Sequence, residues 1–145
     1  MTIRQAGQTD LAEVTRLALL LWPGHEPDAL SADLAPLLDQ PDAALFLCET
    51  DGHPVGFAQC QLRRDYVEGC ETSPVGYLEG VFVEEEHRRQ GVASALVAAC
   101  QDWARAQGCR EFASDCELDN ADSLRFHLGV GFEEANRIIC FTKRL

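Results

Sequence analysis

The sequence predicts an α+β fold in a single domain, residues 1–145, with a mixed, mostly antiparallel central sheet flanked by about four helices. Strand patterns at both ends of the chain, a hairpin signal and amphipathic helix patterns between the strands lead to this prediction. A chain of 145 residues lies in the common size range of one domain. Its 46% hydrophobic and 25% charged residues are typical of a globular protein and exclude a disordered one.

Strand and helix patterns alternate along the chain. The predicted strands are residues 2–5, 43–49, 55–62, 77–83, 112–115 and 138–142. The predicted helices are residues 11–21, 27–38, 91–107 and about 120–130. The dipeptide Asp51-Gly52 favours a hairpin between the second and third strands. The polar stretch 63–74 is expected to be a loop, and loops on a rigid scaffold often carry function.

The helix ends carry their own signals. Asp10 is placed to cap the first helix, and Asp119 or Asn120 the last one. Gly108 is suited to the left-handed residue that ends the third helix. Pro36 makes the last turn of the second helix doubtful.

Charge and cysteine content restrict the partners and the compartment. The net charge of -12 argues against nucleic acid, which needs a basic surface, and suits a cationic small molecule, although an acidic surface can also serve only solubility. No apolar run approaches the roughly 20 residues that span a bilayer, and the first residues lack a secretory pattern. The seven cysteines contain no C-x-x-C pair. We therefore expect a cytoplasmic protein with reduced thiols, no membrane contact and no metal.

A strand-to-helix junction carries the strongest chemical signal. After the strand that ends at Val83 come Arg88 and Arg89, and then Gly91 and Ala93 in the first turn of a helix. Free N–H groups at a helix start attract anions, and small residues let a pyrophosphate approach the backbone. The spacing is not a Walker A loop or a dinucleotide-binding loop. The junction predicts a phosphate site, with a purely structural turn as the alternative.

These residues resemble the GNAT superfamily of N-acetyltransferases, whose signature is Q/R-x-x-G-x-G/A. A later family block is matched by Asn120, Ser123, His127, Gly131 and Phe132. The resemblance implies acetyl-CoA as the donor and no metal, with the Val83 N–H stabilising the oxyanion. The residues that it implies for the cofactor are Val81, Phe82, Val83, Arg88, Arg89, Gln90, Gly91, Val92, Ala93, Ser94 and Asn120.

Within that superfamily the chain is most similar to the aminoglycoside 6′-N-acetyltransferases. The matching stretches are residues 21–25, 65–70, 73–75, 78–80, 108–111, 113–115 and 131–134. The resemblance implies transfer of the acetyl group to a 6′-amino group by direct attack on the thioester, antibiotic resistance, and a possible homodimer through the apolar strand 138–141. The residues that it implies for the substrate are Trp22, His25, Tyr66, Glu79 and Asp115, with Glu79, Tyr66 and His127 as catalytic candidates.

Each assignment has an alternative. Glu79 is either a base that deprotonates the amine or a clamp for the cation, and it shares with Asp115 the alternative of a salt bridge at a strand end. His127 stands where many GNAT enzymes have a tyrosine, so it is either the acid that protonates the thiolate or a packing residue. The remaining alternatives are structural: a core staple for Trp22, a turn cap for His25 and a loop anchor for Tyr66.

Two other functions stay open at this point. One is a GNAT enzyme for another amine, such as a polyamine, an amino acid or a protein amine. The other is a non-catalytic acyl-CoA sensor. Asn136 replaces an acidic substrate contact that the resemblance leads us to expect.

Overall fold

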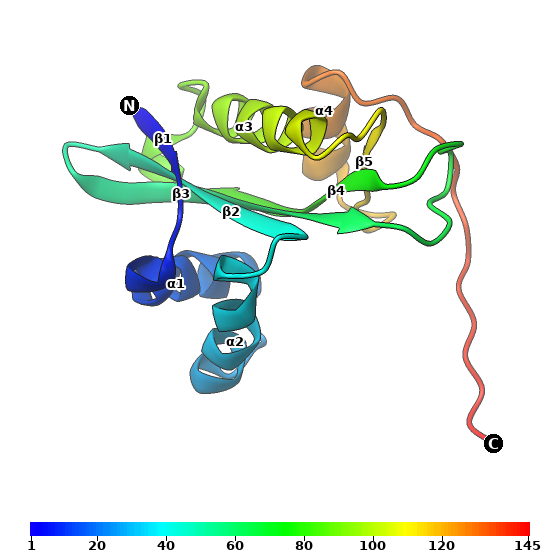
Figure 1. Ribbon diagram of the computed structural model, residues 1–145, viewed down its shortest axis with the longest axis horizontal. Helices are drawn as coiled ribbons and strands as arrows, with labels where there is room; N and C mark the ends of the chain where they lie inside the picture. Colours follow the sequence, from blue (N-terminus) through cyan, green and yellow to red (C-terminus); the bar gives the residue numbers. More distant parts are fainter.

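One five-stranded sheet organises the chain in the computed structural model, which describes residues 1–145. The strands are β1 (Thr2–Gln5), β2 (Ala43–Thr50), β3 (His53–Arg63), β4 (Val75–Val83) and β5 (Phe112–Ser114), and they lie in that order across the sheet (Figure 1). The first four pair antiparallel, whereas β5 runs parallel to β4. The predicted mixed, mostly antiparallel sheet is confirmed.

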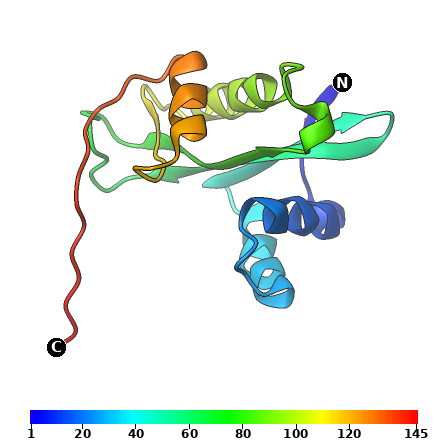
Figure 2. The ribbon, with the colours of Figure 1, turned by 180° about the vertical axis from the view of Figure 1, so that it is seen from behind.

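Four helices cover the two faces of the sheet. They are α1 (Leu11–Leu21), α2 (Pro27–Leu34), α3 (Val92–Ala106) and α4 (Ala121–Gly129). Helices α1 and α2 lie on one face, and α3 and α4 lie on the other (Figures 1 and 2). Short 3-10 turns are η1 (Gln8–Asp10), η2 (Ala35–Leu38) and η3 (Glu85–His87). None of the helices has the length and apolar character that crossing a membrane requires.

The predicted helix 27–38 is divided into two pieces. The α-helix ends at Leu34, and the chain continues as η2. Pro36 has no amide hydrogen for the next α-helical bond, so a 3-10 turn replaces the last α-helical turn.

The prediction that Asp10 caps α1 also needs correction. Asp10 occupies the N-cap position, but its side chain accepts no hydrogen bond from the first turn of α1. Its carboxylate instead accepts a hydrogen bond from the Gly7 N–H at 2.8 Å and pairs with Arg4.

A hydrophobic layer lies on each face of the sheet. On the α3 face, Leu96 and Cys100 pack against Cys48 and Cys60 of β2 and β3. On the α1 and α2 face, Leu17, Leu34, Leu45 and Phe57 form a second layer. All seven cysteines are free thiols, and four of them are buried. This packing fixes the central strands, whose exposed ends then carry the site.

The predicted strand at residues 138–142 is wrong for the single chain. Residues 133–145 form no helix, strand or backbone–backbone hydrogen bond, and they run away from the body as an extended tail (Figures 1 and 2). Ile138, Ile139 and Phe141 are 64%, 80% and 87% exposed. A strand needs a neighbour for its backbone groups, and the tail lies beside none. The apolar side chains of the tail are therefore not buried within one copy of the chain.

Candidate active site

A bulge in β4 displays Glu79. Gln59 of β3 pairs with Gly80, and Cys60 pairs with Leu78, so Glu79 is the extra residue between them. A bulge bends a strand and redirects one side chain, and bulges are frequent next to active sites. The Glu79 side chain is 16% exposed, and its two oxygens accept hydrogen bonds from Arg63 Nη2 at 2.5 and 2.9 Å. Glu79 therefore forms a salt bridge with Arg63, within β4 rather than at a strand end.

Beyond the bulge, β4 has an open edge. The short strand β5 pairs with β4 only from Gly76 to Leu78, so residues 79–83 have no strand on that side. The carbonyl oxygen of Val83 accepts a hydrogen bond from Arg88 Nε at 2.8 Å rather than from a strand. The N–H and C=O of one strand residue point to the same side, so the Val83 N–H faces this open edge as well.

The turn before α3 presents backbone N–H groups that have no acceptor within the protein. Arg89 and Gly91 have φ values of 61° and 82°, which wind the chain tightly into the helix. The first helical bond runs from Ala95 N to Gly91 O at 3.0 Å, so the N–H groups of residues 92–94 have no acceptor within the protein. A Cβ at Gly91 would meet no atom within 4 Å, which leaves space in front of the turn. This geometry suits a phosphate.

The two arginines of the junction behave differently. The Arg88 side chain is held by Val83 O and lies over the Phe82 ring, 5.4 Å from its centroid. The Arg89 side chain is exposed and makes no hydrogen bond or ion pair. Arg89 is therefore the cation that remains available to a ligand at this turn.

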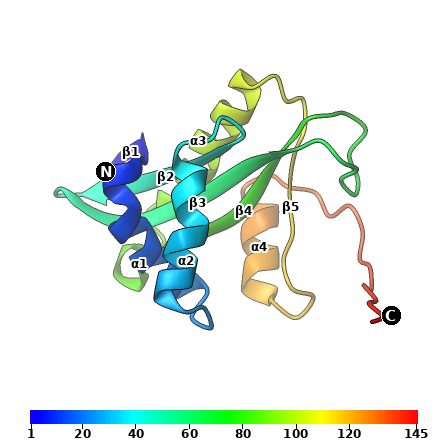
Figure 3. The same cartoon turned by 60° about the horizontal axis from the view of Figure 1, so that its bottom comes forward.

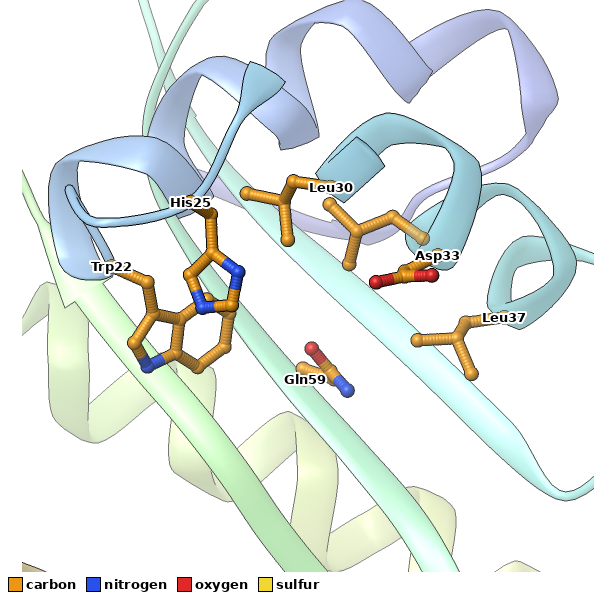
Figure 4. A pocket seen from close by; sticks show the side chains of 7 residues that line it. Trp22, His25, Leu30, Asp33, Leu37 and Gln59 are labelled. Carbon is orange, nitrogen blue, oxygen red and sulfur yellow. The ribbon is translucent and has the colours of Figure 1, made fainter. Parts of the chain in front are cut away.

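A pocket of about 230 Å³ lies on the opposite face of the sheet, under α1 and α2 (Figure 4). It is lined by Trp22, His25, Leu30, Asp33, Leu34, Leu37 and Gln59. The Trp22 ring covers Gly80, where an added Cβ would lie 2.7 Å from the ring, and it meets Phe57 edge-on at 6.1 Å. Trp22 therefore both packs on the core and lines the pocket. The His25 ring lies edge-on to Trp22 and makes no hydrogen bond, so the turn-cap alternative finds no support.

Glu79 and Asp115 belong to one chain of contacts at the β4–β5 end of this face, which α1 and α2 leave uncovered (Figure 3). The Tyr77 hydroxyl donates to the Asp115 carboxylate, and the Arg63 guanidinium lies over the Tyr77 ring, 3.4 Å from its centroid. Burial, together with the neighbouring Asp115 carboxylate, raises the pKa of Tyr77 well above its usual value, so it stays a neutral donor. Arg63 thus joins Glu79 to Tyr77 and Asp115.

The sequence predictions missed Arg63, Tyr77, Asp33 and Gln59. An arginine is unexpected in a cleft for a cation, and its partner is fixed only by the sheet register. One signal was available: Gln59, Gln61 and Arg63 alternate along a strand, and alternate residues share one face.

Tyr66 lies apart from these groups. Its side chain is 77% exposed, and its hydroxyl donates to Glu68 at 3.2 Å. The other Glu68 oxygen accepts from Asn136 Nδ2 at 2.8 Å, which connects the loop to the beginning of the tail. Tyr66 therefore contacts its own loop and does not reach Glu79 or Asp115.

His127 lies where β4 and β5 separate. Its Nδ1 is 2.7 Å from the Ser123 carbonyl oxygen and its Nε2 is 2.8 Å from Ser114 Oγ, which also donates to Leu78 O at 3.1 Å. Phe132 packs beside the ring at 5.2 Å between centroids. The missed residue Ser114 therefore connects His127 to Leu78, the last residue of β4 that pairs with β5. Asn120 caps α4 as expected, with Oδ1 accepting from the Ser123 N–H at 3.1 Å, which leaves its Nδ2 unused.

No group of three or more histidine, cysteine, aspartate or glutamate side chains is placed to hold a metal ion. The groups that can act on a ligand are thus the backbone of the β4–α3 junction, the carboxylates of the opposite face and the His127–Ser114 pair.

Comparison with known proteins relates this arrangement to characterised sequences. The family model described as "Acetyltransferase (GNAT) family" matches residues 11–132. An aminoglycoside N(6′)-acetyltransferase type 1 of Salmonella enteritidis is 45% identical over 144 residues, 99% of both chains. A protein of the same name from Serratia marcescens is 44% identical and covers 89% of both chains.

Solved structures give the same result for the fold. The aminoglycoside acetyltransferase AAC(6′)-Iy, in complex with a bisubstrate analogue of CoA and acetylneamine, superposes with a TM-score of 0.95 at 44% identity. The alignment covers 99% of this chain and 98% of that one. AAC(6′)-Ih from Acinetobacter baumannii superposes with a TM-score of 0.94 at 37% identity and covers 99% and 98%.

Proposed function

Because the chain belongs to the GNAT acetyltransferase family, we propose that it transfers the acetyl group of acetyl-CoA to the 6′-amino group of aminoglycoside antibiotics and so confers resistance. The observation that carries this assignment is its end-to-end similarity to several aminoglycoside N(6′)-acetyltransferases. The site supports it independently, because unpaired backbone N–H groups lie on one face of the open strand edge and the Glu79 and Asp115 carboxylates lie on the other. That arrangement suits an anionic donor and a cationic acceptor.

The donor side holds acetyl-CoA through the backbone. The pyrophosphate accepts hydrogen bonds from the N–H groups of residues 91–94, and Arg89 supplies the free cationic side chain. Arg88 and Gln90 hold the shape of the turn through Val83 O and Glu86 O. The pantetheine arm extends along the open edge Val81–Val83, where its amides take the place of a strand, and Asn120 Nδ2 donates to it.

The acceptor side holds the amine at Glu79. An alkyl ammonium has a pKa of about 10 and must lose a proton before it attacks. Glu79 attracts the cation and takes that proton, directly or through one water. The neutral amine then attacks the thioester carbon, and the Val83 N–H stabilises the resulting oxyanion. The nitrogen of the intermediate carries one proton more than the amide, and it loses that proton to water. The C–S bond then breaks to give the amide and the CoA thiolate. The thiolate takes the hydroxyl proton of Ser114 as that hydroxyl leaves Leu78 O, and the protonated His127 ring returns a proton to Ser114.

The other acceptor residues orient the substrate. Asp115 holds a second ammonium, and Trp22 and His25 pack against the sugar rings. Tyr66 closes over the bound substrate from its exposed position on the loop. These roles explain why the carboxylates come from β4 and β5 whereas the aromatic groups come from the α1–α2 turn and the loop.

Thiol release from acetyl-CoA tests the function, with kanamycin, tobramycin, spermidine and a lysine peptide as acceptors. We expect rapid release with the two aminoglycosides alone, and NMR of the product should place the acetyl group on the 6′-nitrogen. Turnover with spermidine or the peptide alone would retain the family and the donor but reject the aminoglycoside. Binding of CoA without turnover on any amine would favour a sensor.

We also propose a homodimer formed through the C-terminal tail. Ile138, Ile139 and Phe141 form an exposed apolar run, and the outer edge of β5 has no partner strand. Pairing of the tail with a second copy would satisfy both. Sedimentation velocity should give a dimer for the chain and a monomer for the Ile138→Asp, Phe141→Asp double variant. Identical sedimentation of the two proteins would reject the interface.

The remaining proposals concern the cellular location, the charge of the partners and the bounds of the domain. Free thiols throughout are typical of a reducing compartment, which supports a cytoplasmic location. The net charge of -12 supports binding of cations rather than nucleic acid. The single sheet with its two hydrophobic layers supports one catalytic domain over residues 1–145.

A further inference from the structure

The pocket beside Trp22 contains polar groups that the proposed chemistry does not use. Asp33 of α2 is exposed at its rim and forms no ion pair or hydrogen bond. Gln59 of β3 lies at its floor and is only 8% exposed. Gln59 Nε2 donates to Gln61 Oε1 at 3.1 Å, so its Oε1 has no partner within the protein. Figure 4 shows the Gln59 amide and the Asp33 carboxylate both turned toward the pocket.

These groups define the chemistry of a ligand. The Gln59 amide oxygen makes no hydrogen bond within the protein, so it can accept one from a ligand donor that reaches it. A carboxylate without a counter-ion attracts an ammonium, and no arginine or lysine lines the pocket to compete. The apolar remainder, Leu30, Leu34 and Leu37, together with the Trp22 ring, suits the C–H faces of a saturated ring. The pocket therefore fits a ring that carries both ammonium and hydroxyl groups.

The pocket lies next to Glu79, where the reacting amine is proposed to bind. Gln59 pairs with Gly80 across β3 and β4, and Glu79 is the next residue of β4. Neighbouring strands lie about 4.8 Å apart. The volume of about 230 Å³ is below the roughly 300–1,000 Å³ of pockets that hold a whole drug-sized ligand. The space is thus right for a single ring next to the one whose amine is at Glu79.

We propose that Asp33 and Gln59 form a specificity subsite for the aminocyclitol ring that adjoins the acetylated sugar. Asp33 binds an ammonium of that ring, and Gln59 Oε1 accepts a hydrogen bond from one of its amino or hydroxyl groups. The proposal rests on the proposed function, because it requires an acceptor amine at Glu79. In this proposal, Asp33 of α2 and Gln59 of β3 make the enzyme prefer an acceptor with several amino groups over a single amino sugar. Both residues lie away from the reacting atoms.

The test compares Asp33→Asn and Gln59→Leu on two acceptors. Neamine contains the aminocyclitol ring, whereas methyl 6-amino-6-deoxyglucoside offers a 6-amino group on a single sugar. For Asp33→Asn we expect KM for neamine to rise about tenfold or more with kcat nearly unchanged, because a lost charge-assisted bond is worth roughly 1.5–3 kcal/mol and acts on binding alone. For the single sugar, kcat/KM should not change. Gln59→Leu should show the same pattern with a smaller rise.

Matched controls separate the subsite from other effects. Asp28→Asn removes the same charge from the same helix outside the pocket and should leave KM for neamine unchanged. An equal loss on both acceptors, or no change in KM for neamine with Asp33→Asn, would overturn the subsite. Failure of the proposed function looks different, because the parent chain would then acetylate neither acceptor.

Discussion

The donor side of this site consists mainly of backbone groups, whereas the acceptor side consists of side chains. At the β4–α3 junction, backbone N–H groups and two residues with positive φ form the proposed anion site, and the sequence from Val83 to Ser94 is continuous. On the opposite face, Glu79, Arg63, Tyr77 and Asp115 are side chains from three strands or their ends. A site made of backbone is insensitive to most side-chain changes, whereas a network of charges depends on each member.

This contrast gives different kinetic expectations for the two sides. Changes at the junction should alter the binding of acetyl-CoA, and only where the backbone conformation itself is disturbed. Changes in the network should alter the steps that involve the amine. The variants below separate the two, from the largest expected effect to the smallest.

Glu79→Gln removes the carboxylate at the bulge while nearly keeping its shape. Because a positioned base contributes about 10²- to 10⁴-fold, we expect kcat/KM for kanamycin to fall by roughly that factor with KM for acetyl-CoA unchanged. Steady-state thiol release measures both constants. Glu133→Gln, which neutralises an exposed carboxylate without a partner, is the control. A loss confined to KM for kanamycin would make Glu79 a clamp rather than a base.

Gly91→Ala tests the backbone side. A side chain at φ 82° is strained by about 1–2 kcal/mol, and the new methyl group would enter the space left for the pyrophosphate. KM for acetyl-CoA should rise about tenfold, with KM for the aminoglycoside unchanged. Gly108→Ala is the matched control, because Gly108 has φ 90° at the other end of α3. Equal changes in KM for the two variants would indicate loss of folding rather than loss of a phosphate site.

Arg63→Met removes the cation from the acceptor network. Arg63 neutralises Glu79, so its loss should strengthen binding of a polycation, and we expect KM for kanamycin to fall about threefold to tenfold at low salt. Added salt should reduce the difference. If KM rises instead, Arg63 serves to position Glu79, and Arg63→Lys should then restore part of the affinity.

Asp10→Asn concerns neither side and should affect stability alone. The hydrogen bond from Arg4, followed by the bond from the Gly7 N–H, lowers the pKa of Asp10 from 3.8 to about 2. A lowered folded-state pKa contributes stability above pH 3.8, which is lost as the pH falls toward 2. For this partly exposed pair we expect Tm to drop by about 3 °C at neutral pH. The difference should disappear near pH 2, and a difference independent of pH would point to another cause.

The sequence was informative wherever one local segment decides the structure. Helices α1, α3 and α4 begin and end within about one residue of their predicted bounds, because apolar spacing and the Asn120 and Gly108 signals lie within each segment. The strand-to-helix junction before α3 was predicted for the same reason. Two local predictions were exceptions. Pro36 lacks the N–H of the next α-helical bond, and the Asp10 carboxylate binds Arg4, six residues away, and the Gly7 N–H instead of capping α1.

The contacts on the acceptor side were not predicted, because they depend on the register between separate strands. Nothing in the order of residues states that Gln59 lies opposite Gly80 while Cys60 lies opposite Leu78, yet this one-residue mismatch creates the bulge at Glu79. Arg63 reaches Glu79 between β3 and β4, and the contact of Tyr77 with Asp115 depends on the separate register of β4 with β5.

The sequence by itself therefore determined most of the elements and the family resemblance, and it predicted the backbone anion site, because helix caps, apolar periods and positive-φ glycines act over a few neighbouring residues. Only the tertiary structure decided which carboxylate is paired, which aromatic ring lines the pocket, and that the strand predicted at 138–142 has no partner within one copy. Those outcomes require groups far apart in the chain to meet, and sheet register and packing between layers decide such meetings.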